Sequence, residues 1–327
     1  MKAAAIIRII VGLVIAVLLT AILVVVLTGN NIFARLGWNN NWVDRFTDRT
    51  TYSSGGVNGD NNEVVVSDKA SVDAASIKKI KIGWTSGSVN VRVGTTDEIV
   101  FSESSYRTLT DRQKMRYTIS DSGVLEIHFS EDFESFFGWL NVDASMPAKT
   151  LTLEVPASLM VQLEKLEVES VSANIDLSGV YGANTDLSSV SGEIRCADVA
   201  TQDLELSTTS GSIVCENCTA DKLEIDNVSG SIRAEGEFTR AKADTVSGEV
   251  KLLFATAPDE VTADSVSGNI TLALPEGTGF TAKLDTVSGS LSCAFAGTLG
   301  SDLVVVGDGG VSYRCSTVSG NLNIEKN

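Results

Sequence analysis

Histidine is almost absent from this chain, and cysteine, proline and aromatic residues are sparse. The only histidine is His128, so a Ser-His-Asp triad or a two-histidine metal site would depend on that one side chain. The sequence contains no G-x-S-x-G, P-loop or G-x-G-x-x-G motif. We therefore expect no catalytic residues and no cofactor, and a protein that is not an enzyme.

Basic residues are too few to balance the acidic ones. The chain has 25 Lys and Arg against 42 Asp and Glu, which gives a formal net charge of −17. Such a surface repels phosphate backbones, because nucleic-acid binding needs Lys and Arg to displace condensed counterions. The composition therefore predicts no nucleic-acid partner.

A long apolar run stands near the N-terminus. Residues 9–27 are uncharged over 19 positions, close to the ~20 residues that a helix needs to cross a bilayer. A cleavable signal peptide has a shorter core of roughly 7 to 15 residues, so we predict a retained single-pass transmembrane anchor over residues 1–29. Residues 30–73 then form a juxtamembrane segment and a flexible linker, in which SSGGVNGDNN is typical of a spacer.

A five-residue motif, V/T-S-G-x-I/V/L, dominates the rest of the chain. Its central glycines are Gly87, Gly192, Gly211, Gly230, Gly248, Gly268, Gly289 and Gly320, and Ala173 replaces glycine in a ninth copy. The intervals from residue 173 onward are 19, 19, 19, 18, 20, 21 and 31. A period near 19 is too short for a pair of helices and suits one turn of a β-coil.

Side-chain types sort into columns when the glycine is numbered zero. Positions +2 and +4 are apolar in every copy, as in Ile213 and Cys215, and positions −7 and −5 form a second apolar pair, as in Leu204 and Leu206. Alternation of this kind marks the inward face of a strand, and the parity slips between −5 and −2, so the chain must bend there. The glycine marks a bend or a close approach of the backbone.

These columns predict the fold class. We expect an all-β, β-helix-like solenoid of about 19 residues per turn, preceded by the N-terminal transmembrane helix. Residues 74–165 are the N-terminal β part of the solenoid with an aromatic insert, and residues 166–327 are the regular repeat. The last motif, VSGNLNIEKN, ends almost at the chain end without an evident cap, so self-association by end-to-end stacking is one hypothesis.

The bend carries acidic and hydroxyl side chains. Position −4 holds Asp226, Asp244, Asp264 and Asp285, and position −3 holds a hydroxyl or amide residue. Short polar side chains of this type favour turns, so turn capping is the preferred interpretation of the aspartates. A ladder of bound divalent cations is the alternative, although calcium-binding repeats supply several oxygen ligands per turn and this bend supplies one acid.

The cysteines invite a second structural interpretation. Cys196 and Cys215 share the inward +4 column, and Cys215 forms a single C-x-x-C with Cys218. Structural zinc needs four ligands, and no second pair or nearby histidine is present. Small buried hydrophobic residues are therefore the preferred interpretation, and a disulfide between adjacent turns is the alternative.

Aromatic residues concentrate in the segment SEDFESFFGWLNVDASM. Phe133, Phe136, Phe137 and Trp139 are candidates for a partner-binding patch. The alternative is that the segment covers an open end or a flank of the solenoid, as any stacked array requires.

The repeated motif, the entry segment IKKIKIGWTSGSVNVRV and the strand LTLEVPASLMVQLEKLEV resemble those of a bacterial family of unknown function whose members are usually labelled as candidate adhesins. The resemblance covers roughly residues 74–325. It implies a β-solenoid ectodomain at the cell envelope, associated with surface adhesion or envelope-stress sensing.

Residues and resemblance together predict a non-catalytic binding module held in the cell membrane by residues 9–27. We expect the N-terminus in the cytoplasm and the solenoid outside, because long acidic domains translocate with little regard to charge. An envelope protein or a glycan is the expected partner. A self-assembling structural protein and a polysaccharide-acting solenoid enzyme, which would need only carboxylates, are the alternatives.

Overall fold

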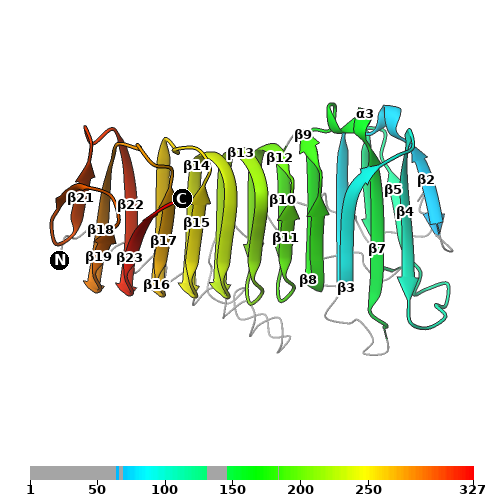
Figure 1. The fold of residues 1–327 in the computed structure, drawn as a ribbon. Coiled ribbons are helices and arrows are strands. Elements are labelled where there is room, and N and C mark those ends of the chain that lie inside the picture. The colour runs from blue at the N-terminus through cyan, green and yellow to red at the C-terminus, as the bar shows by residue number, and fades with distance from the viewer. Residues whose placement is uncertain (1–63, 66–68, 131–145, 183) are drawn as a thin grey trace, which may run out of the picture.

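The computed structural model describes residues 64–65, 69–130, 146–182 and 184–327. These residues form one continuous β-coil whose 23 strands belong to a single sheet (Figure 1). The all-β solenoid prediction is confirmed. In the described ranges no helix is long and apolar enough to cross a membrane, and the predicted anchor at residues 9–27 lies outside them.

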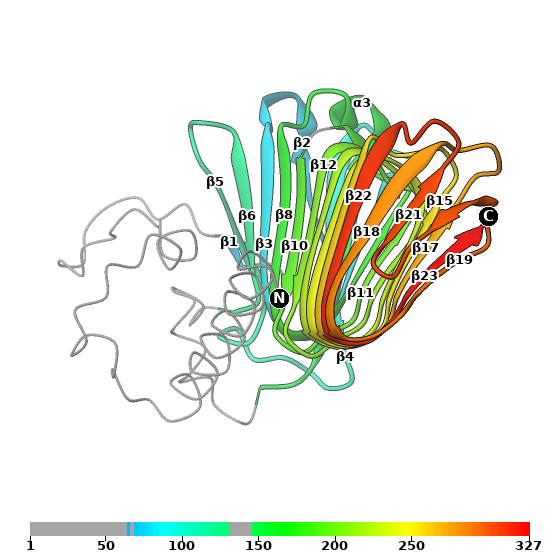
Figure 2. The ribbon, with the colours of Figure 1, turned by 90° about the vertical axis from the view of Figure 1, so that its left-hand side faces the viewer.

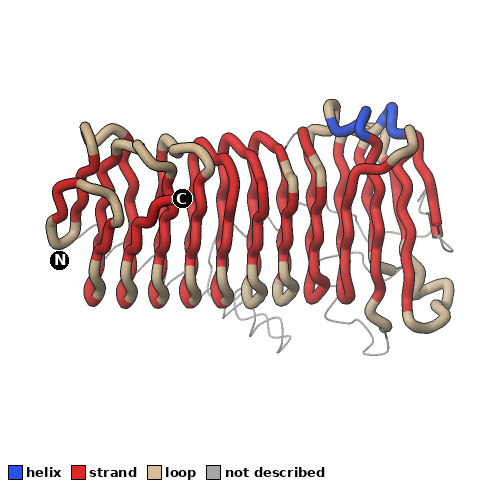
Figure 3. The backbone as a smooth tube through the Cα atoms, in the orientation of Figure 1, coloured by secondary structure: helices blue, strands red, loops and turns tan. Residues whose placement is uncertain are grey.

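Each turn of the coil has two walls that meet at the Val-Ser-Gly motif, which we call the VSG corner (Figure 2). The strand before the corner belongs to the first wall, and the strand after it belongs to the second wall. A loop or a bent strand at the opposite edge, which we call the upper edge, leads to the next turn. The only described helical segments, a 3₁₀ turn at Ala74–Ser76 and helix α3 (Ala157–Met160), lie at this upper edge near the N-terminal end (Figure 3).

The regular turns are built from short strands and from four long ones that pass between the walls. The first-wall strands are β10 (Asn184–Ser189), β12 (Ala200–Thr208), β16 (Glu260–Ser267), β18 (Phe280–Ser288) and β22 (Val311–Ser319). The second-wall strands are β11 (Ile194–Ala197), β15 (Val250–Phe254), β17 (Ile270–Leu274), β19 (Leu291–Cys293) and β23 (Leu322–Lys326). The long strands are β3 (Lys79–Gly94), β8 (Lys165–Ser178), β13 (Ile213–Ser229) and β14 (Ile232–Ser247), and β9 (Tyr181–Gly182) lies at the upper edge.

Neighbouring turns pair in parallel and in register, so equivalent repeat positions stack on one another. Ile194, for example, pairs with Ile175 on one side and Ile213 on the other. All nine residues at position +2 are buried, and at +4 only Cys293 is partly exposed, because it lies in the outermost turn. The predicted inward columns are therefore correct.

The corner glycines are required by the backbone of the adjacent turn. A Cβ at Gly211 would lie 1.9 Å from the carbonyl oxygen of Gly192, and one at Gly192 would lie 1.9 Å from that of Ala173. The same conflict recurs at every later corner. A close approach is present at these glycines, but the stacked neighbour makes it, and not the facing wall that the parity of the columns suggested.

Hydroxyl groups at position −3 cap the early corners. The Ser189 Oγ accepts a hydrogen bond from the Gly192 amide at 2.9 Å, and the Thr208 Oγ1 accepts one from the Gly211 amide at 3.2 Å. At Gly230, Gly248 and Gly268 the glycine has a positive φ, and its amide instead donates to the serine carbonyl of the next turn, at 3.2 Å to Ser247 in the case of Gly230. The corner therefore has two backbone forms within one coil.

Antiparallel strands close the N-terminal end. β6 (Val124–His128) and β7 (Lys149–Pro156) together form one turn outside β3, one strand in each wall. The remaining strands of this end are β1 (Val64–Val65) and β5 (Arg116–Ile119) beside β6, and β2 (Lys69–Asp73) and β4 (Glu98–Ser105) beside β7. β2 falls inside the range predicted as linker, so the folded part begins earlier than the predicted boundary at residue 74.

The last turn of the sequence is not the last turn of the coil. β22 lies between β16 and β18, and β23 lies between β17 and β19, so the Gly320 corner is stacked between those of Gly268 and Gly289 (Figure 1). Two further strands, β20 (Gly297–Leu299) and β21 (Leu303–Val306), form a hairpin whose β21 pairs antiparallel with β18. The 31-residue interval contains this hairpin, and the predicted uncapped final turn at VSGNLNIEKN is wrong because that turn is internal.

Candidate functional site

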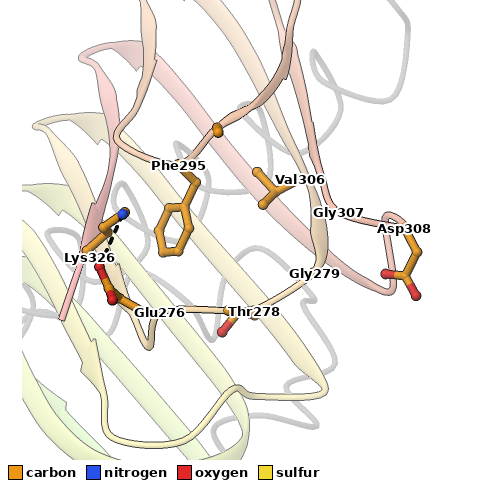
Figure 4. Close-up of a pocket in the computed structure, with 10 residues that line it drawn as sticks. Glu276, Thr278, Gly279, Phe295, Val306, Gly307, Asp308 and Lys326 are labelled. Carbon is orange, nitrogen blue, oxygen red and sulfur yellow. Dashed lines mark hydrogen bonds and ion pairs between the residues drawn. The ribbon is translucent and has the colours of Figure 1, made fainter.

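A pocket of about 440 Å³ lies at the upper edge of the C-terminal end (Figure 4). Four connections meet there: the turn between β17 and β18, the turn between β19 and β20, the turn between β21 and β22, and the end of β23. Apart from glycine and alanine, the residues that line it are Glu276, Thr278, Phe295, Val306, Asp308 and Lys326. We call this site the terminal pocket.

Glycines allow the chain to cross over itself beside the terminal pocket. The turn between β21 and β22 passes over Gly279, where a Cβ would lie 2.6 Å from the Asp308 Oδ1. A Cβ at Gly310 would lie 2.8 Å from the Gly279 carbonyl oxygen, and Gly307 and Gly309 adopt positive φ values of 63° and 78°. The Gly-Asp-Gly-Gly sequence at 307–310 therefore makes the crossover that inserts the last turn, and it places Asp308 at the rim.

An aromatic ring forms the apolar side of the terminal pocket. Phe295 is half-buried and meets Phe280 edge to face, with ring centroids 5.4 Å apart and planes at 89°. Phe280 in turn stacks on Tyr313 at 5.5 Å, and the Tyr313 hydroxyl donates to the Pro258 carbonyl at 3.1 Å. The Phe295 ring thus packs on the buried Phe280 ring, which Tyr313 supports in turn.

Charged groups form the polar rim. The Lys326 Nζ lies 3.1 Å from the Glu276 Oε1 and 5.7 Å from the centroid of the Phe295 ring. The Asp308 Oδ1 accepts a hydrogen bond from the Gly310 amide at 3.2 Å, and Figure 4 shows the Asp308 side chain directed away from Phe295 and Lys326. The side chain of Glu276 is 73% exposed, so this ion pair is accessible to solvent and to bound molecules.

None of the terminal-pocket residues was among the sequence-predicted candidates. They lie in connections that the repeat does not describe, and they converge only because the last turn is inserted. The run Gly-Asp-Gly-Gly within the 31-residue interval is the sequence signal from which a special crossover could have been predicted.

The aspartates at position −4 form a broken ladder on the outer face of the first wall. Asp226, Asp244 and Asp264 are consecutive register partners, but Ser316 stands between Asp264 and Asp285. The Ser316 hydroxyl donates to the Asp264 carboxylate. The expected run of four adjacent carboxylates is therefore interrupted, because the last turn is inserted between the turns of Asp264 and Asp285.

These aspartates pair with side chains rather than with corner amides. The Lys242 Nζ lies 3.1 Å from Asp244, and the Lys283 Nζ lies 2.5 Å from Asp285. Hydroxyl caps at position −3 occur at the early corners, whose residues at −4 are the serines Ser188 and Ser207. Burial raises the pKa of Asp244 to about 6, with further raising by Asp264 and Asp226 and opposition from Lys242.

No group of three or more His, Cys, Asp or Glu in the described ranges has the arrangement of a metal site. Cys196, Cys215 and Cys218 are all fully buried and free of disulfides. The neighbouring thiols Cys196 and Cys218 interact with Cys215, and the contact with Cys196, together with burial, raises the pKa of the Cys215 thiol. The interpretation of Cys196 and Cys215 as small buried residues is confirmed, while Cys293 is only partly buried.

A buried ion pair lies at the N-terminal end. Lys149 stands opposite Gly87 at the position of a corner glycine, and its Nζ lies 2.7 Å from the Glu103 Oε2, with both side chains at most 2% exposed. The Nζ also donates to the carbonyls of Gln113 and Phe129 and lies 4.1 Å from the Phe129 ring centroid. Burial lowers the pKa of Lys149, and Glu103 opposes that shift. All three ammonium protons are engaged, so this lysine is structural.

The predicted aromatic patch of Phe133, Phe136, Phe137 and Trp139 lies outside the described residues. His128 ends β6, which pairs with β3 in the N-terminal part of the coil, and it lies 3.8 Å from Glu126. The terminal pocket lies at the other end of the coil. The histidine and the pocket carboxylates therefore cannot act on one substrate.

Comparison with known proteins identifies relatives by family and by fold. The sequence model of a family described as Toastrack DUF4097 matches residues 77–325. No curated protein matches the chain. A candidate lipid-binding protein from Parabacteroides distasonis, 16% identical, has a similar fold with a TM-score of 0.51, over 82% of this chain and 98% of that one.

Two more distant structures are also similar. A candidate adhesin from Parabacteroides distasonis is 17% identical over 82% of this chain and 98% of its own, with a TM-score of 0.44. A candidate cell adhesion protein from Clostridium sporogenes is 13% identical over 80% of this chain and 98% of its own, with a TM-score of 0.31.

Proposed function

Since the chain belongs to the Toastrack DUF4097 family, we propose that it is a membrane-anchored, extracytoplasmic binding module that serves adhesion or envelope-stress sensing and carries out no catalysis. The observation that carries the binding role is the terminal pocket, which combines a rigidly supported aromatic ring with an exposed charged rim. The interior of the coil is packed with apolar side chains, so recognition falls to its outer surface and its ends.

The chemistry of the rim supports binding rather than catalysis. A general acid in a glycoside hydrolase is a carboxyl group whose pKa is raised in a buried, apolar setting. Glu276 has the opposite setting, because it is largely exposed and ion-paired with Lys326. The only histidine lies at the other end of the coil.

The anchored, extracytoplasmic arrangement is supported by the apolar run at residues 9–27 and by the strongly acidic remainder of the chain. Protease accessibility tests it. We expect an epitope tag placed after Asn327 to be removed by protease added to spheroplasts, while a cytoplasmic marker protein stays intact. A tag that is protected until the membrane is lysed would place the coil in the cytoplasm and refute the proposal. Recovery of the untreated chain in the soluble fraction would refute the anchor.

A further inference from the structure

We propose that the terminal pocket binds a neutral saccharide, with one sugar ring stacked on Phe295 and its hydroxyls bonded to Glu276 and Lys326. The inference rests on the proposed binding function and names the ligand class of that site.

The size and composition of the terminal pocket suit a small, amphipathic ligand. Its volume of about 440 Å³ lies within the ~300–1,000 Å³ of small-molecule sites. Its lining combines Phe295 and Val306 with three charged side chains. A pyranose ring has the matching division, with C–H groups on its faces and hydroxyls around its edge.

The Phe295 ring is suited to stacking because its support fixes its orientation before a ligand arrives. Phe280 holds it edge to face at 5.4 Å, and Tyr313 supports Phe280 from below. A ligand therefore meets an aromatic surface that loses little conformational entropy on binding. The Lys326 ammonium lies 5.7 Å from the same ring, so a hydroxyl at the edge of a stacked sugar has a donor within reach.

The rim supplies both kinds of hydrogen-bonding group that hydroxyls need. The carboxylate of Glu276 accepts, and the Lys326 ammonium donates. Side chains are missing at Gly277 and Gly307, which have φ values of 83° and 63°, so backbone groups at the rim stay accessible. Such mixed donors and acceptors favour a ligand whose hydroxyls both donate and accept.

The charge and polarity of the terminal pocket disfavour anionic ligands and acyl chains. The rim has two carboxylates against one ammonium that is already paired, and the whole chain carries −17, so a phosphate or an acidic sugar is repelled. An acyl chain needs an enclosed apolar cavity, whereas this lining includes the charged side chains of Glu276, Asp308 and Lys326. A neutral saccharide fits both conditions.

The test uses the full-length chain in a zwitterionic detergent, because glycoside detergents would themselves occupy a sugar site. The probes are maltotriose, cellobiose and N,N′-diacetylchitobiose, with glucuronic acid as the anionic comparison. Saturation-transfer NMR detects contact with the sugar ring protons, and titration gives the affinity. We expect millimolar or tighter binding of at least one neutral probe, and weaker or no binding of glucuronic acid.

Two variants locate the binding, each with a matched control. Phe295→Leu keeps an apolar side chain against Phe280 but removes the ring, and it should weaken binding by about three- to tenfold. Glu276→Gln should weaken it by a similar factor. Tyr106→Leu and Glu98→Gln, exposed at the other end of the coil, should leave affinity within about twofold.

Circular dichroism and melting curves confirm that each variant is folded. The inference is overturned by no saturation transfer from any neutral probe, by equal affinity in Phe295→Leu, or by preferential transfer from glucuronic acid. Transfer from monomeric dihexanoyl phosphatidylcholine with none from sugars would assign the pocket to lipid and also overturn it. None of these outcomes bears on protease accessibility, so failure here is distinguishable from failure of the proposed anchored arrangement.

Discussion

Replacing Gly211 by alanine should be among the most damaging single substitutions in the regular coil. The new Cβ would lie 1.9 Å from the Gly192 carbonyl oxygen, 2.6 Å from its carbonyl carbon and 3.1 Å from the Glu193 amide nitrogen. All three are backbone atoms that the parallel ladder holds in place, so no side chain can rotate away. Relief requires that the two turns separate at the corner.

The magnitude follows from the backbone shift. Overpacking of a well-filled interior costs about 1–3 kcal/mol. Separation at this corner also weakens inter-turn hydrogen bonds such as that from the Ser210 amide to the Val190 carbonyl, at about 1 kcal/mol each. We therefore expect Gly211→Ala to lower the free energy of unfolding by about 3–4 kcal/mol.

Urea unfolding followed by far-ultraviolet circular dichroism measures this change, and hydrogen exchange locates it. Ala173→Gly is the matched control, since it changes the same repeat position in the opposite direction. It should cost only about 0.5–1 kcal/mol, because glycine adds backbone entropy to the unfolded chain. A Gly211→Ala protein within 1 kcal/mol of the natural one would refute the close-approach account of the corner glycines.

Three further predictions concern titratable groups. The pKa of Asp244 is raised to about 6 in the folded state from an ordinary 3.8, so its contribution to stability is full below pH 4 and is lost as pH rises from about 4 to 6. Asp244→Asn should therefore raise the free energy of unfolding at pH 7 by about 1 kcal/mol, after allowance for a side chain that is one-third exposed. A calcium titration in which the variant has lost stabilisation by the cation would contradict this. Lys149→Met should lower the free energy of unfolding by about 3–5 kcal/mol, because it leaves the buried Glu103 carboxylate without its partner. Adding Glu103→Gln to this variant should restore most of the melting temperature, and a double variant with no such restoration would contradict the ion-pair account. Maleimide should modify the partly exposed Cys293 first and the buried Cys218 only after unfolding, which intact-mass analysis would show. Rapid labelling of Cys218 in the folded protein would contradict its burial.

The repeat columns could be predicted from sequence because each one depends only on local alternation and on a short period. Ile213 and Cys215 face inward because apolar and polar residues alternate along their strand, as the sequence predicted. The corner glycine is required because adjacent turns stack closely. Prediction failed at the bend because the corner changes its backbone form along the coil. The hydroxyl at −3 caps the glycine amide at early corners such as that of Ser189, whereas at Gly230, Gly248 and Gly268, where −4 is an aspartate, the amide donates to the serine carbonyl of the next turn.

The order in which the turns stack could not be predicted, because equivalent repeat positions carry similar side chains in every turn and any two turns could therefore pair in register. Asp264 pairs with Ser316, and Asp285 pairs with the same Ser316, so the ladder would accept either order. Only the hairpin β20–β21 and the glycine crossover at 307–310 select the inserted arrangement. The terminal pocket depends on that choice, which is why its residues carried no repeat signal.

Removal of the inserted turn tests this dependence. A chain ended after Gly310 loses β22 and β23, and with them Lys326 and the link between β16–β17 and β18–β19. Stability in a coil is a sum of nearest-neighbour terms, so turns up to β17 should keep their hydrogen-exchange protection while the terminal pocket is lost. Because the columns match, β18 has a register-compatible partner in β16, and protection of β18 in the shortened chain would show that it stacks there directly. Loss of protection throughout the coil would contradict the nearest-neighbour account, since it would mean that the C-terminal turn stabilises strands it does not touch.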